Sequence, residues 1–374
     1  MVNKQDLRVA IIGGGYGGAA AAVALHNIGI KADLYEQAPE IGEVGAGIGL
    51  RPPSIHCFKE WGIYDAVKKV STESQYMAVL KGNGEVIVKE RWPLLTDNKD
   101  ERWSRLIHRA DFIEVFMDHI PAENVHLGHK CEKVIEHDDY VEVHFENGKK
   151  IEVDLVIGAD GIRSNIRKQF ISDAEPVPAK AHAYRAVVDN WDQFGFENDN
   201  IFRVYVEGDA MIYLLPLEHR NQVSFDVTVK SEDTSWVPEV TNEQILDIVR
   251  NFEPRLQKIA ETLTIEDYTC RSLFDIEPLD NWSTNRITLL GDAAHAMLHH
   301  QGSGANMAIQ DAKALADALR DADTIPEALK KYQEERMPIT REYQRLSRQE
   351  PTHESTTAFP EKEKFDKEVA KQAQ

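Results

Sequence analysis

The feature that most constrains the fold is a glycine-rich turn near the start of the chain. The segment LRVAIIGGGYGGAAAAVALHNIG (7–29) predicts a strand, a tight Gly-x-Gly-x-x-Gly turn starting at Gly13, and an alanine-rich helix. The next segment, KADLYEQA (31–38), predicts a second strand ending near Glu36, where a carboxylate can accept a hydrogen bond from a ribose hydroxyl. Together they predict a βαβ unit that binds a dinucleotide, with the pyrophosphate at the helix N-terminus.

Two further acidic residues follow buried strands much later in the chain. VIGADGIRSNIR (156–167) places Asp160 just after one apolar strand, and LLGDAAH (289–295) places Asp292 just after another. The glycine turn alone leaves NAD and FAD as alternatives, because both cofactors use it. A nicotinamide dinucleotide has no ribityl chain, whereas the ribityl hydroxyls of a flavin need acceptors. The two later acids therefore favour FAD.

The order of the predicted elements indicates an α/β fold with interleaved domains. A Rossmann-like FAD-binding domain takes residues from the start, middle and end of the chain, and two C-terminal helices close it. Alternating strands between 181 and 229 predict a largely antiparallel β-sheet substrate domain with one solvated face. The expected boundaries are 1–72, 106–176 and 276–348 for the FAD-binding domain, 73–105 and 177–275 for the substrate domain, and 349–374 for a polar tail.

Charge and cysteine content exclude several classes of protein. A formal net charge of −20 disfavours binding to nucleic acid or to an anionic membrane, both of which require a basic face. No apolar run is long enough for a membrane span, and the first predicted strand leaves no room for a signal peptide. Cys57, Cys131 and Cys270 are too widely spaced to indicate a disulfide framework. We therefore expect a cytoplasmic protein with no nucleic-acid or membrane partner.

The three motifs occur in an order and spacing typical of one flavoprotein family. The glycine turn, the Asp-Gly motif at 160–161 and the Gly-Asp motif at 291–292 resemble those of the single-component FAD-dependent aromatic hydroxylases. The resemblance extends from about residue 7 to about residue 348. Within the family, the segments VGAGIGLRPPSIHCFKEWGI and LLGDAAHAMLHHQGSGANMAIQDAKALADAL are most similar to the branch of salicylate hydroxylase, the hydroxybenzoate hydroxylases and 6-hydroxynicotinate 3-monooxygenase.

This resemblance implies an FAD-dependent monooxygenase. NAD(P)H would be a transient cosubstrate, because FAD would occupy the single dinucleotide fingerprint, and O2 would be the oxidant. A small aromatic or heteroaromatic substrate, of the phenolic-acid type, would be hydroxylated through a flavin hydroperoxide. We expect a monomer or a homodimer. Two alternatives remain: a flavin monooxygenase acting on a larger polycyclic compound such as an antibiotic, and a non-catalytic protein with the FAD fold, which the intact loop at 301–306 disfavours.

The family pattern also implies which residues contact FAD. Asp292 would hold the ribityl chain, and the backbone after Gly302 would face the N1/C2-carbonyl edge of the flavin ring. The helix that starts near Ala305 would direct its positive end there. Arg109 would contact FAD from a helix start, with a surface salt bridge as its alternative. The implied cofactor-binding set is Gly13, Gly15, Gly17, Gly18, Glu36, Gln37, Gly49, Arg109, Cys131, Asp160, Asp292, Gly302, Gly304, Ala305 and Asn306.

The stretch GDAAHAMLHHQGSGAN (291–306) has a second interpretation, as a metal site formed by its aspartate and its histidines. Metal ligands must be fixed on one surface, whereas glycines and a predicted helix end separate these residues, so we expect no metal. His295 is expected to be structural. His299 stands where the family usually has a proline beside the flavin face on which oxygen reacts. It is therefore either a catalytic polar group facing the substrate or an incidental, solvent-facing histidine.

The substrate pocket is expected between the inserted sheet and the flavin ring. Arg51 is a candidate ligand for a substrate carboxylate or phenolate, with a surface or FAD-phosphate role as its alternative. Tyr213 matches a tyrosine that faces the substrate in a relative; it is a candidate catalytic and substrate-binding residue, and its alternative is a core aromatic. Gly49 stands where relatives carry glutamine or histidine. Arg185 and Arg203 are weaker candidates.

Overall fold

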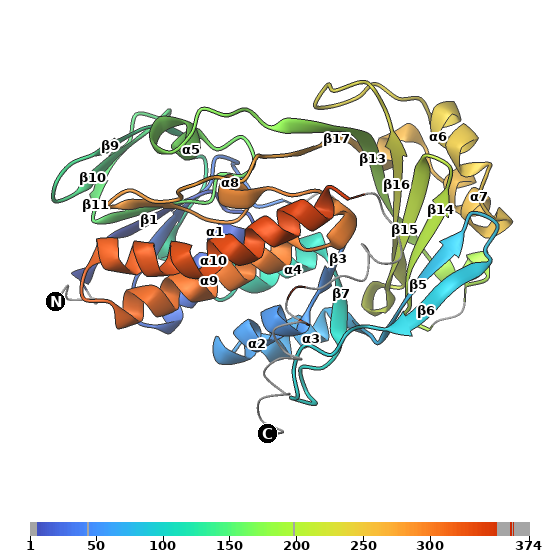
Figure 1. Ribbon diagram of the computed structural model, residues 1–374, viewed down its shortest axis with the longest axis horizontal. Helices are drawn as coiled ribbons and strands as arrows, with labels where there is room; N and C mark the ends of the chain where they lie inside the picture. The colour runs from blue at the N-terminus through green and yellow to red at the C-terminus, as the bar shows by residue number, and fades with distance from the viewer. Residues whose placement is uncertain (1–5, 43–44, 197–198, 350–359, 361, 363–374) are drawn as a thin grey trace.

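The computed structural model describes residues 6–42, 45–196, 199–349, 360 and 362. The predicted polar tail, 349–374, therefore lies almost wholly outside the described residues. Figure 1 shows a parallel sheet with its helices at one end of the long axis and a mainly antiparallel sheet at the other, with a small sheet between them.

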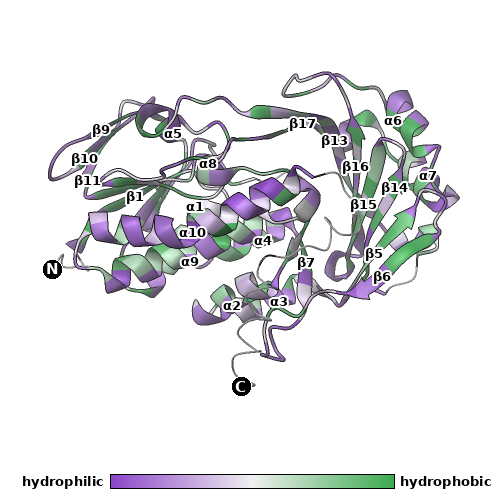
Figure 2. Ribbon diagram, viewed as in Figure 1, coloured by the Kyte–Doolittle hydropathy of each residue, from purple (hydrophilic) through white to green (hydrophobic). Residues whose placement is uncertain are grey.

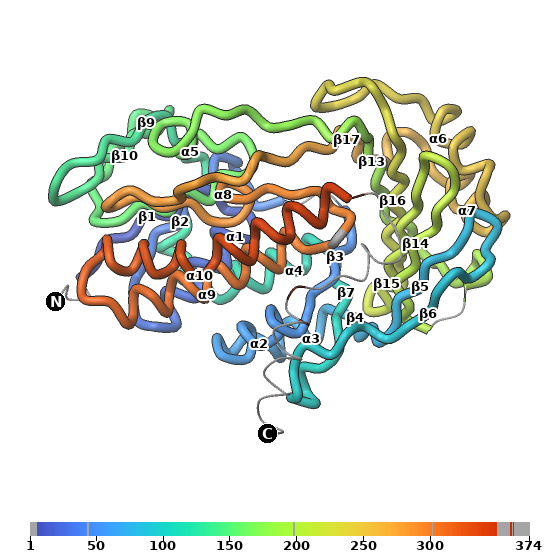
Figure 3. The backbone as a smooth tube through the Cα atoms, viewed as in Figure 1, coloured from blue at the N-terminus to red at the C-terminus, as the bar shows by residue number. Residues whose placement is uncertain are grey.

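A five-stranded parallel sheet forms the core of the first part. Its strand order is β18-β12-β1-β2-β8, so segments from the start, middle and end of the chain lie side by side. Figure 3 shows β1 beside β2. Every residue of β1 and β12 is buried, as expected for apolar strands covered on both faces. The strands are β1 (Val9–Ile12), β2 (Ala32–Tyr35), β8 (Val125–His126), β12 (Leu155–Gly158) and β18 (Ile287–Leu289). Because they are parallel, their carboxyl ends meet at one edge.

Helices pack closely on this sheet. The alanine-rich helix α1 contacts both β1 and β2, and it lies against α9, which in turn packs on α10. In Figure 2, α9 and α10 carry hydrophilic and hydrophobic stripes, the pattern of helices that bury one face. The helices of this part are α1 (Tyr16–Asn27), α2 (Pro52–Glu60), α3 (Tyr64–Lys69), α4 (Arg109–Met117), α5 (Asn165–Phe170), α8 (Asp292–His295), α9 (Gly304–Asp321) and α10 (Ile325–Ser347).

A seven-stranded sheet forms the second part, in the order β17-β13-β16-β15-β14-β5-β6. All neighbours are antiparallel except β14 and β5. The prediction of one solvated face was wrong for the central strands: all eight residues of β15 are buried, because helices α6 and α7 cover one face and the other faces a pocket. The elements are β5 (Tyr76–Lys81), β6 (Val86–Arg91), β13 (Val177–Asp189), β14 (Phe202–Glu207), β15 (Ala210–Leu217), β16 (Gln222–Lys230), β17 (Thr269–Asp275), α6 (Asn242–Val249) and α7 (Pro254–Glu261).

Two three-stranded sheets complete the fold. One, in the order β3-β7-β4, contacts β15 and so links the two large sheets; the other has the order β11-β10-β9. Their strands are β3 (Gly47–Leu50), β4 (Ser71–Ser74), β7 (Ser104–His108), β9 (Cys131–Glu136), β10 (Val141–Phe145) and β11 (Lys150–Val153). The chain enters the seven-stranded sheet twice: once between β2 and β8, for β5 and β6, and again between β12 and β18, for β13 to β17. The exact domain boundaries given above stay a prediction.

Candidate functional site

In the glycine turn after β1, the packing of the protein requires glycine at positions 13 and 18 but not at position 15. Gly13 has a φ of +109°, and a Cβ there would lie 2.3 Å from the carbonyl oxygen of Ala159. A Cβ on Gly18 would lie 1.9 Å from the carbonyl oxygen of Gly13. Around Gly15, by contrast, no described atom lies within 4 Å of a Cβ position. The turn therefore keeps open space directly in front of α1.

The N-terminus of α1 faces this turn with unsatisfied backbone donors. Gly15 is the N-cap residue and supplies no side-chain acceptor, and the first N–H groups of any helix have no partner within the helix. A Cβ on Gly17 would lie 2.7 Å from Cδ2 of Leu290, so a larger residue there would require the Leu290 side chain to shift. An open space beside a helix N-terminus fits a pyrophosphate group.

Glu36 lies beside the turn in a fixed orientation. Its Oε2 accepts a hydrogen bond from the backbone N–H of Gly14 at 2.6 Å, and its Oε1 accepts one from Ala38 at 2.8 Å. A carboxylate has about four acceptor positions, so both oxygens can still accept from a ribose hydroxyl. The neighbouring Gln37 has an exposed side chain.

Asp160, after β12, holds the start of α5. Its Oδ2 accepts backbone hydrogen bonds from Asn165 at 2.8 Å and from Ile166 at 3.1 Å. Burial raises its pKa, and within the described residues Oδ1 is buried without a partner. The carbonyl of nearby Cys131 accepts from the Asn165 side chain at 3.2 Å. Burial, with a smaller contribution from Asp160, raises the pKa of the Cys131 thiol to about 12. Contacts of these two residues with FAD stay a prediction.

Asp292, after β18, lies next to the N-terminus of α9. Its side chain is open to the pocket, but protein surrounds it on the other sides, and burial raises its pKa. Its Oδ1 lies 3.7 Å from a Cβ position on Gly304, the first residue of α9. The N-cap side chain of this 18-residue helix makes no capping hydrogen bond. A carboxylate and a helix N-terminus thus border the same cavity.

Asn306 ties the loop before α9 to the loop before α2. Its Oδ1 accepts from the backbone N–H of Arg51 at 2.9 Å and from the hydroxyl of Ser54 at 2.8 Å. Its Nδ2 donates to the carbonyls of Gly49 at 2.8 Å and Gly302 at 3.1 Å. The fully buried side chain is therefore engaged with protein. Any contact of this residue with FAD would come from its backbone, as predicted for the loop.

Arg109 and Tyr16 form the next part of the same cavity wall. Nε of Arg109 donates to the Tyr16 hydroxyl at 2.7 Å, and the guanidinium carbon lies 5.3 Å from the centre of the Tyr16 ring. Both side chains line the pocket, together with Gly49, Asp292, Gly302, Gly304 and Ala305. Tyr16 was not predicted as a cofactor residue. Of the predicted cofactor residues, the tertiary structure brings Gly49, Arg109, Asp292, Gly302, Gly304 and Ala305 to one cavity, whereas, among the described residues, the glycines of the turn, Glu36, Cys131 and Asp160 do not line it.

We predict that Asp292→Ala weakens FAD binding by about 1–3 kcal/mol, because it removes an acceptor that bound FAD would cover. The dissociation constant can be measured by titrating apoprotein with FAD and following flavin fluorescence. Asp280→Ala is a matched control, since Asp280 precedes the same strand but is fully exposed. Equal FAD affinity in both variants would contradict the role given to Asp292.

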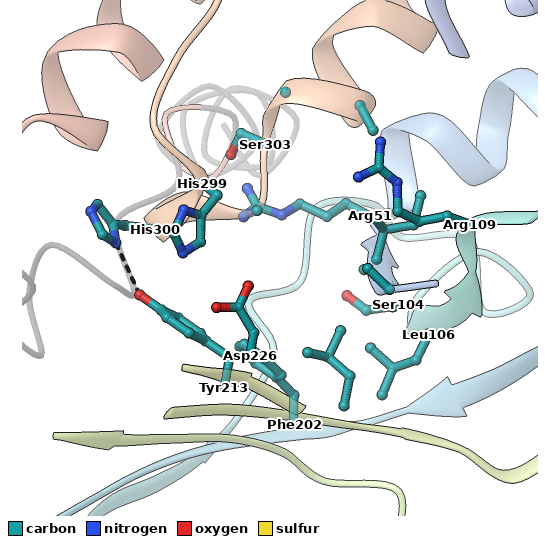
Figure 4. A pocket seen from close by; sticks show the side chains of 18 of the residues that line it. Arg51, Ser104, Leu106, Arg109, Phe202, Tyr213, Asp226, His299, His300 and Ser303 are labelled. Carbon is teal, nitrogen blue, oxygen red and sulfur yellow. Dashed lines mark hydrogen bonds between the residues drawn. The ribbon is translucent and has the colours of Figure 1, made fainter. Parts of the chain in front are cut away.

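The opposite wall of the cavity belongs to the seven-stranded sheet. Figure 4 shows Tyr213, Phe202 and Asp226 projecting from that sheet toward His299 and His300. The apolar part of the wall also includes Met77, Trp92, Val204 and Leu215, and Leu106 of β7 in the small sheet packs against it. The cavity holds about 290 Å³, near the lower end of the roughly 300–1,000 Å³ typical of small-molecule sites.

Tyr213 and the two histidines contact one another. The Tyr213 hydroxyl lies 3.0 Å from Nδ1 of His300, and the Tyr213 ring meets the His299 ring edge to face at 5.3 Å. Nε2 of His299 lies 3.1 Å from the hydroxyl of Thr228. Burial lowers the pKa of His300, and burial is also the main cause that lowers the pKa of His299 well below its usual range. Both imidazoles are therefore neutral near pH 7, while burial raises the pKa of Tyr213 so that its phenol stays protonated.

The three arginine candidates have different positions and partners in the structure. Arg51 is 6% exposed, so the surface alternative was wrong, and its Nη1 donates to the Tyr343 hydroxyl at 3.4 Å. Arg185 lines the pocket and pairs with Asp226. Arg203 pairs with Asp199, and among the described residues it does not line the pocket. Alternation along β14 explains this, because the neighbours of Arg203 on either side face the cavity.

The polar side chains of 291–306 contact different partners. Nε2 of His295 lies 2.5 Å from Oδ2 of Asp311, which is also bound to Arg336, whereas His299 and His300 face the seven-stranded sheet. Across the part of the chain that the structure describes, no three His, Cys, Asp or Glu side chains are grouped as they would be around a metal ion. His295 is thus buried in a structural contact, as expected.

Sequence analysis missed Asp226 as a pocket residue and Thr228 as its hydrogen-bond partner. They lie two residues apart on β16 in the segment NQVSFDVTV, and such spacing puts both side chains on one face of a strand. A charged residue inside an apolar alternating segment was the available signal. No helix in the described residues is long and apolar enough to cross a membrane.

Comparison with known proteins agrees with this geometry. The family model described as FAD binding domain matches residues 6–347 of the chain. The chain is 30% identical over 349 residues to 3-amino-4-hydroxybenzoate 2-monooxygenase from Streptomyces cremeus, covering 92% of this chain and 86% of that protein. It is 30% identical over 336 residues to 6-hydroxynicotinate 3-monooxygenase from Pseudomonas fluorescens, covering 85% of this chain and 84% of that protein. Its fold is similar to that of HpxO from Klebsiella pneumoniae, solved with FAD and uric acid, with a TM-score of 0.84, 22% identity, and coverage of 99% of this chain and 93% of that chain.

Proposed function

The chain belongs to the FAD-binding-domain family of flavoprotein aromatic hydroxylases, and from this premise we propose that it hydroxylates a small phenolic or heteroaromatic ring between the two large sheets. The predicted family, the Rossmann-like α/β fold class and FAD as cofactor are confirmed. The protein is an FAD-dependent monooxygenase that uses NAD(P)H and O2. The identity of its substrate and the roles of single residues are proposals.

One observation carries the proposal: Asp292 after β18, the N-terminus of α9 and the aromatic wall of the seven-stranded sheet border one cavity. The residues present fit FAD, since the space at Gly15 suits the pyrophosphate, Glu36 the ribose and Asp292 the ribityl chain. When bound, FAD supplies hydride uptake from NAD(P)H and oxygen activation. The protein's part is to orient the ring and exclude water.

Tyr213 is the residue we assign to proton handling on the substrate. Its phenol is protonated and can donate to the neutral Nδ1 of His300 at 3.0 Å. The lone pairs of the Tyr213 oxygen then remain available to accept a hydrogen bond from a substrate hydroxyl. If the substrate proton moves to this oxygen, the Tyr213 proton moves in the same step to Nδ1 of His300. His299, which contacts the same ring, is a second proposed catalytic residue. Arg51 as a ligand of a substrate carboxylate stays a prediction, because its observed partner is Tyr343.

We further propose a monomer or homodimer in the cytoplasm. The cytoplasmic location is supported by the cysteines, because all three are free. The net charge of −20 disfavours a nucleic-acid partner.

The function is tested by a panel of phenolic acids, aminophenols and hydroxypyridines added to the FAD-loaded protein. We expect at least one compound to accelerate NADH or NADPH oxidation and to yield a product heavier by one oxygen atom. A protein that binds FAD but shows no stimulation with any ring of this size would contradict the proposal. Stimulation only by polycyclic compounds would support the alternative.

We predict that Tyr213→Phe uncouples the reaction. Without the hydroxyl, the product formed per NADH consumed should fall roughly tenfold, while NADH oxidation continues and hydrogen peroxide is released. Product and peroxide are measured together against oxygen uptake. Tyr205→Phe is the control, because Tyr205 lies on β14 of the same sheet but donates to Glu253, on the side away from the cavity. If both variants stay coupled, Tyr213 has no role in proton handling.

A further inference from the structure

The cavity wall contains one ion pair that the proposed function does not use. Arg185 on β13 and Asp226 on β16 are directly opposite each other in the antiparallel ladder, and Nε of Arg185 donates to Oδ2 of Asp226 at 2.7 Å. Both residues line the pocket, with side chains 20% and 10% exposed, and Figure 4 shows Asp226 pointing into it. The pair is thus nearly desolvated but still accessible from the cavity.

Each partner keeps hydrogen-bonding capacity. Oδ1 of Asp226 accepts from the Thr228 hydroxyl at 3.0 Å, which leaves about half of the four acceptor positions of the carboxylate unused. Within the residues that the structure describes, Nη1 and Nη2 of Arg185 donate to no protein acceptor. The wall therefore presents N–H donors immediately beside carboxylate acceptors.

The Arg185–Asp226 pair is not electrostatically complementary to a substrate carboxylate. A substrate carboxylate bound to Arg185 would lie beside the negative charge of Asp226, and like charges in a poorly hydrated site repel strongly. The neighbouring imidazoles add no compensating positive charge, because burial lowers the pKa of both His299 and His300. Thr228, which already donates to Asp226, adds none either.

A ring edge with a carbonyl beside an N–H is complementary to the pair. The carbonyl oxygen can accept from a free Nη of Arg185, and the ring N–H can donate to Asp226, giving two adjacent charge-assisted hydrogen bonds. The rest of such a flat ring can stack near the aromatic side chains of Phe202 and Tyr213, whose rings are 6.3 Å apart and nearly parallel.

We propose that the Arg185–Asp226 pair determines specificity and selects a heteroaromatic lactam, a ring of the hydroxypyridone type, over a hydroxybenzoate. The inference rests on the proposed function and narrows its substrate class. Sites built to pair with a substrate N–H discriminate strongly against analogues that lack it, because the buried partner is then left unsatisfied.

The test is binding to the FAD-loaded protein, measured by calorimetry without NAD(P)H. Three probes are compared: 5-hydroxy-2-pyridone, its N-methyl derivative, and 3-hydroxybenzoate. We expect the free pyridone to bind at least about tenfold more tightly than either of the others. Because the N-methyl probe changes the ligand and leaves the protein intact, this comparison holds even if a variant fails to fold.

Asp226→Asn provides the test from the protein side. The substitution keeps the shape of the side chain but replaces an acceptor by an amide donor, so the preference for the free pyridone over its N-methyl derivative should disappear. Asp209→Asn is the matched control on the same sheet, at an exposed hairpin between β14 and β15, and should keep that preference. An unchanged flavin spectrum shows that both variants retain the cofactor site.

The inference is overturned if 3-hydroxybenzoate binds as tightly as the pyridone, if N-methylation has no effect, or if no pyridone binds. Hydroxylation of benzoates without any pyridone preference would leave the monooxygenase assignment intact and reject only this inference. Selective pyridone binding without NAD(P)H oxidation on any ring would support the recognition site and reject the proposed function. The two failures are therefore distinguishable.

Discussion

Replacing Gly15 with leucine is expected to abolish FAD binding while the apoprotein remains folded. The backbone at Gly15 has φ −72° and ψ −173°, which any residue adopts, and no described atom lies within 4 Å of a Cβ there. The added side chain would instead occupy the space reserved for the pyrophosphate. Loss of two backbone hydrogen bonds to a charged phosphate would cost about 3–6 kcal/mol, or more than a hundredfold in affinity.

The measurement is FAD titration of the apoprotein, together with its thermal unfolding followed by circular dichroism. Gly18→Ala is an informative comparison, because its Cβ would lie 1.9 Å from the Gly13 carbonyl oxygen and should destabilise the fold itself. We therefore expect Gly15→Leu to lose FAD at an unchanged apoprotein melting temperature, and Gly18→Ala to lower that temperature. A Gly15→Leu protein that binds FAD normally would refute the pyrophosphate position.

Asp311→Ala is expected to be the most destabilising single change near the site. Asp311 is completely buried between His295 at 2.5 Å and Arg336 at 2.7 Å, and Oδ2 also accepts from the backbone N–H of Gly291 at 3.3 Å. Removing the carboxylate leaves the Arg336 charge buried without its partner. Breaking a buried pair in this way costs about 3–5 kcal/mol, measured as the change in unfolding free energy in urea.

Asp317→Ala is the control on the same helix. Asp317 pairs with Lys313 and Arg320 near the surface, and such pairs contribute at most about 1 kcal/mol. An equal effect of the two substitutions would contradict the importance of the buried contact. Because Gly291 precedes Asp292, we also expect Asp311→Ala to weaken FAD binding.

The effect of Asp311→Ala should depend on pH. Burial alone would raise the pKa of Asp311, but the charges of His295 and Arg336 and their hydrogen bonds lower it overall. The folded-state pKa is then below the unfolded value of about 3.9. The stabilisation by Asp311 is complete above that unfolded value and is lost as the pH falls through the folded-state pKa. The stability difference between wild type and Asp311→Ala should therefore be constant near pH 7 and shrink in strong acid.

The sequence was sufficient to identify FAD as the cofactor and to place three acids at strand ends, because these signals are local; their contacts with FAD stay a prediction. A strand, a turn that needs a positive φ at Gly13 and a helix occupy consecutive residues, and an acid at a strand end needs only the strand to be identified. In a parallel sheet, all such ends meet at one edge. Glu36, Asp160 and Asp292 could therefore be assigned to one edge from the sequence without knowledge of the strand order.

The hydrophobic pattern along the strands led to a wrong prediction of solvent exposure where other elements cover both faces of a strand. Residues in β15 alternate only weakly, and the expected solvated face is covered because α6 and α7 pack on one side and the cavity wall lies on the other. The sequence of a strand records how apolar each face is, but it does not record which element covers that face.

What the sequence by itself determined is the family, the interleaved α/β fold and the cofactor, because these depend on motifs whose residues act through their own strand or turn. Only the tertiary structure determined which residues form the proposed substrate wall of the cavity. Arg185 and Asp226 come together because β13 and β16 are neighbours in one register, and the Tyr213–His300 contact joins that sheet to the loop before α9. Such pairings depend on which strands and loops become neighbours, and that choice is made by packing of the whole chain, since a strand's own sequence does not specify its partner.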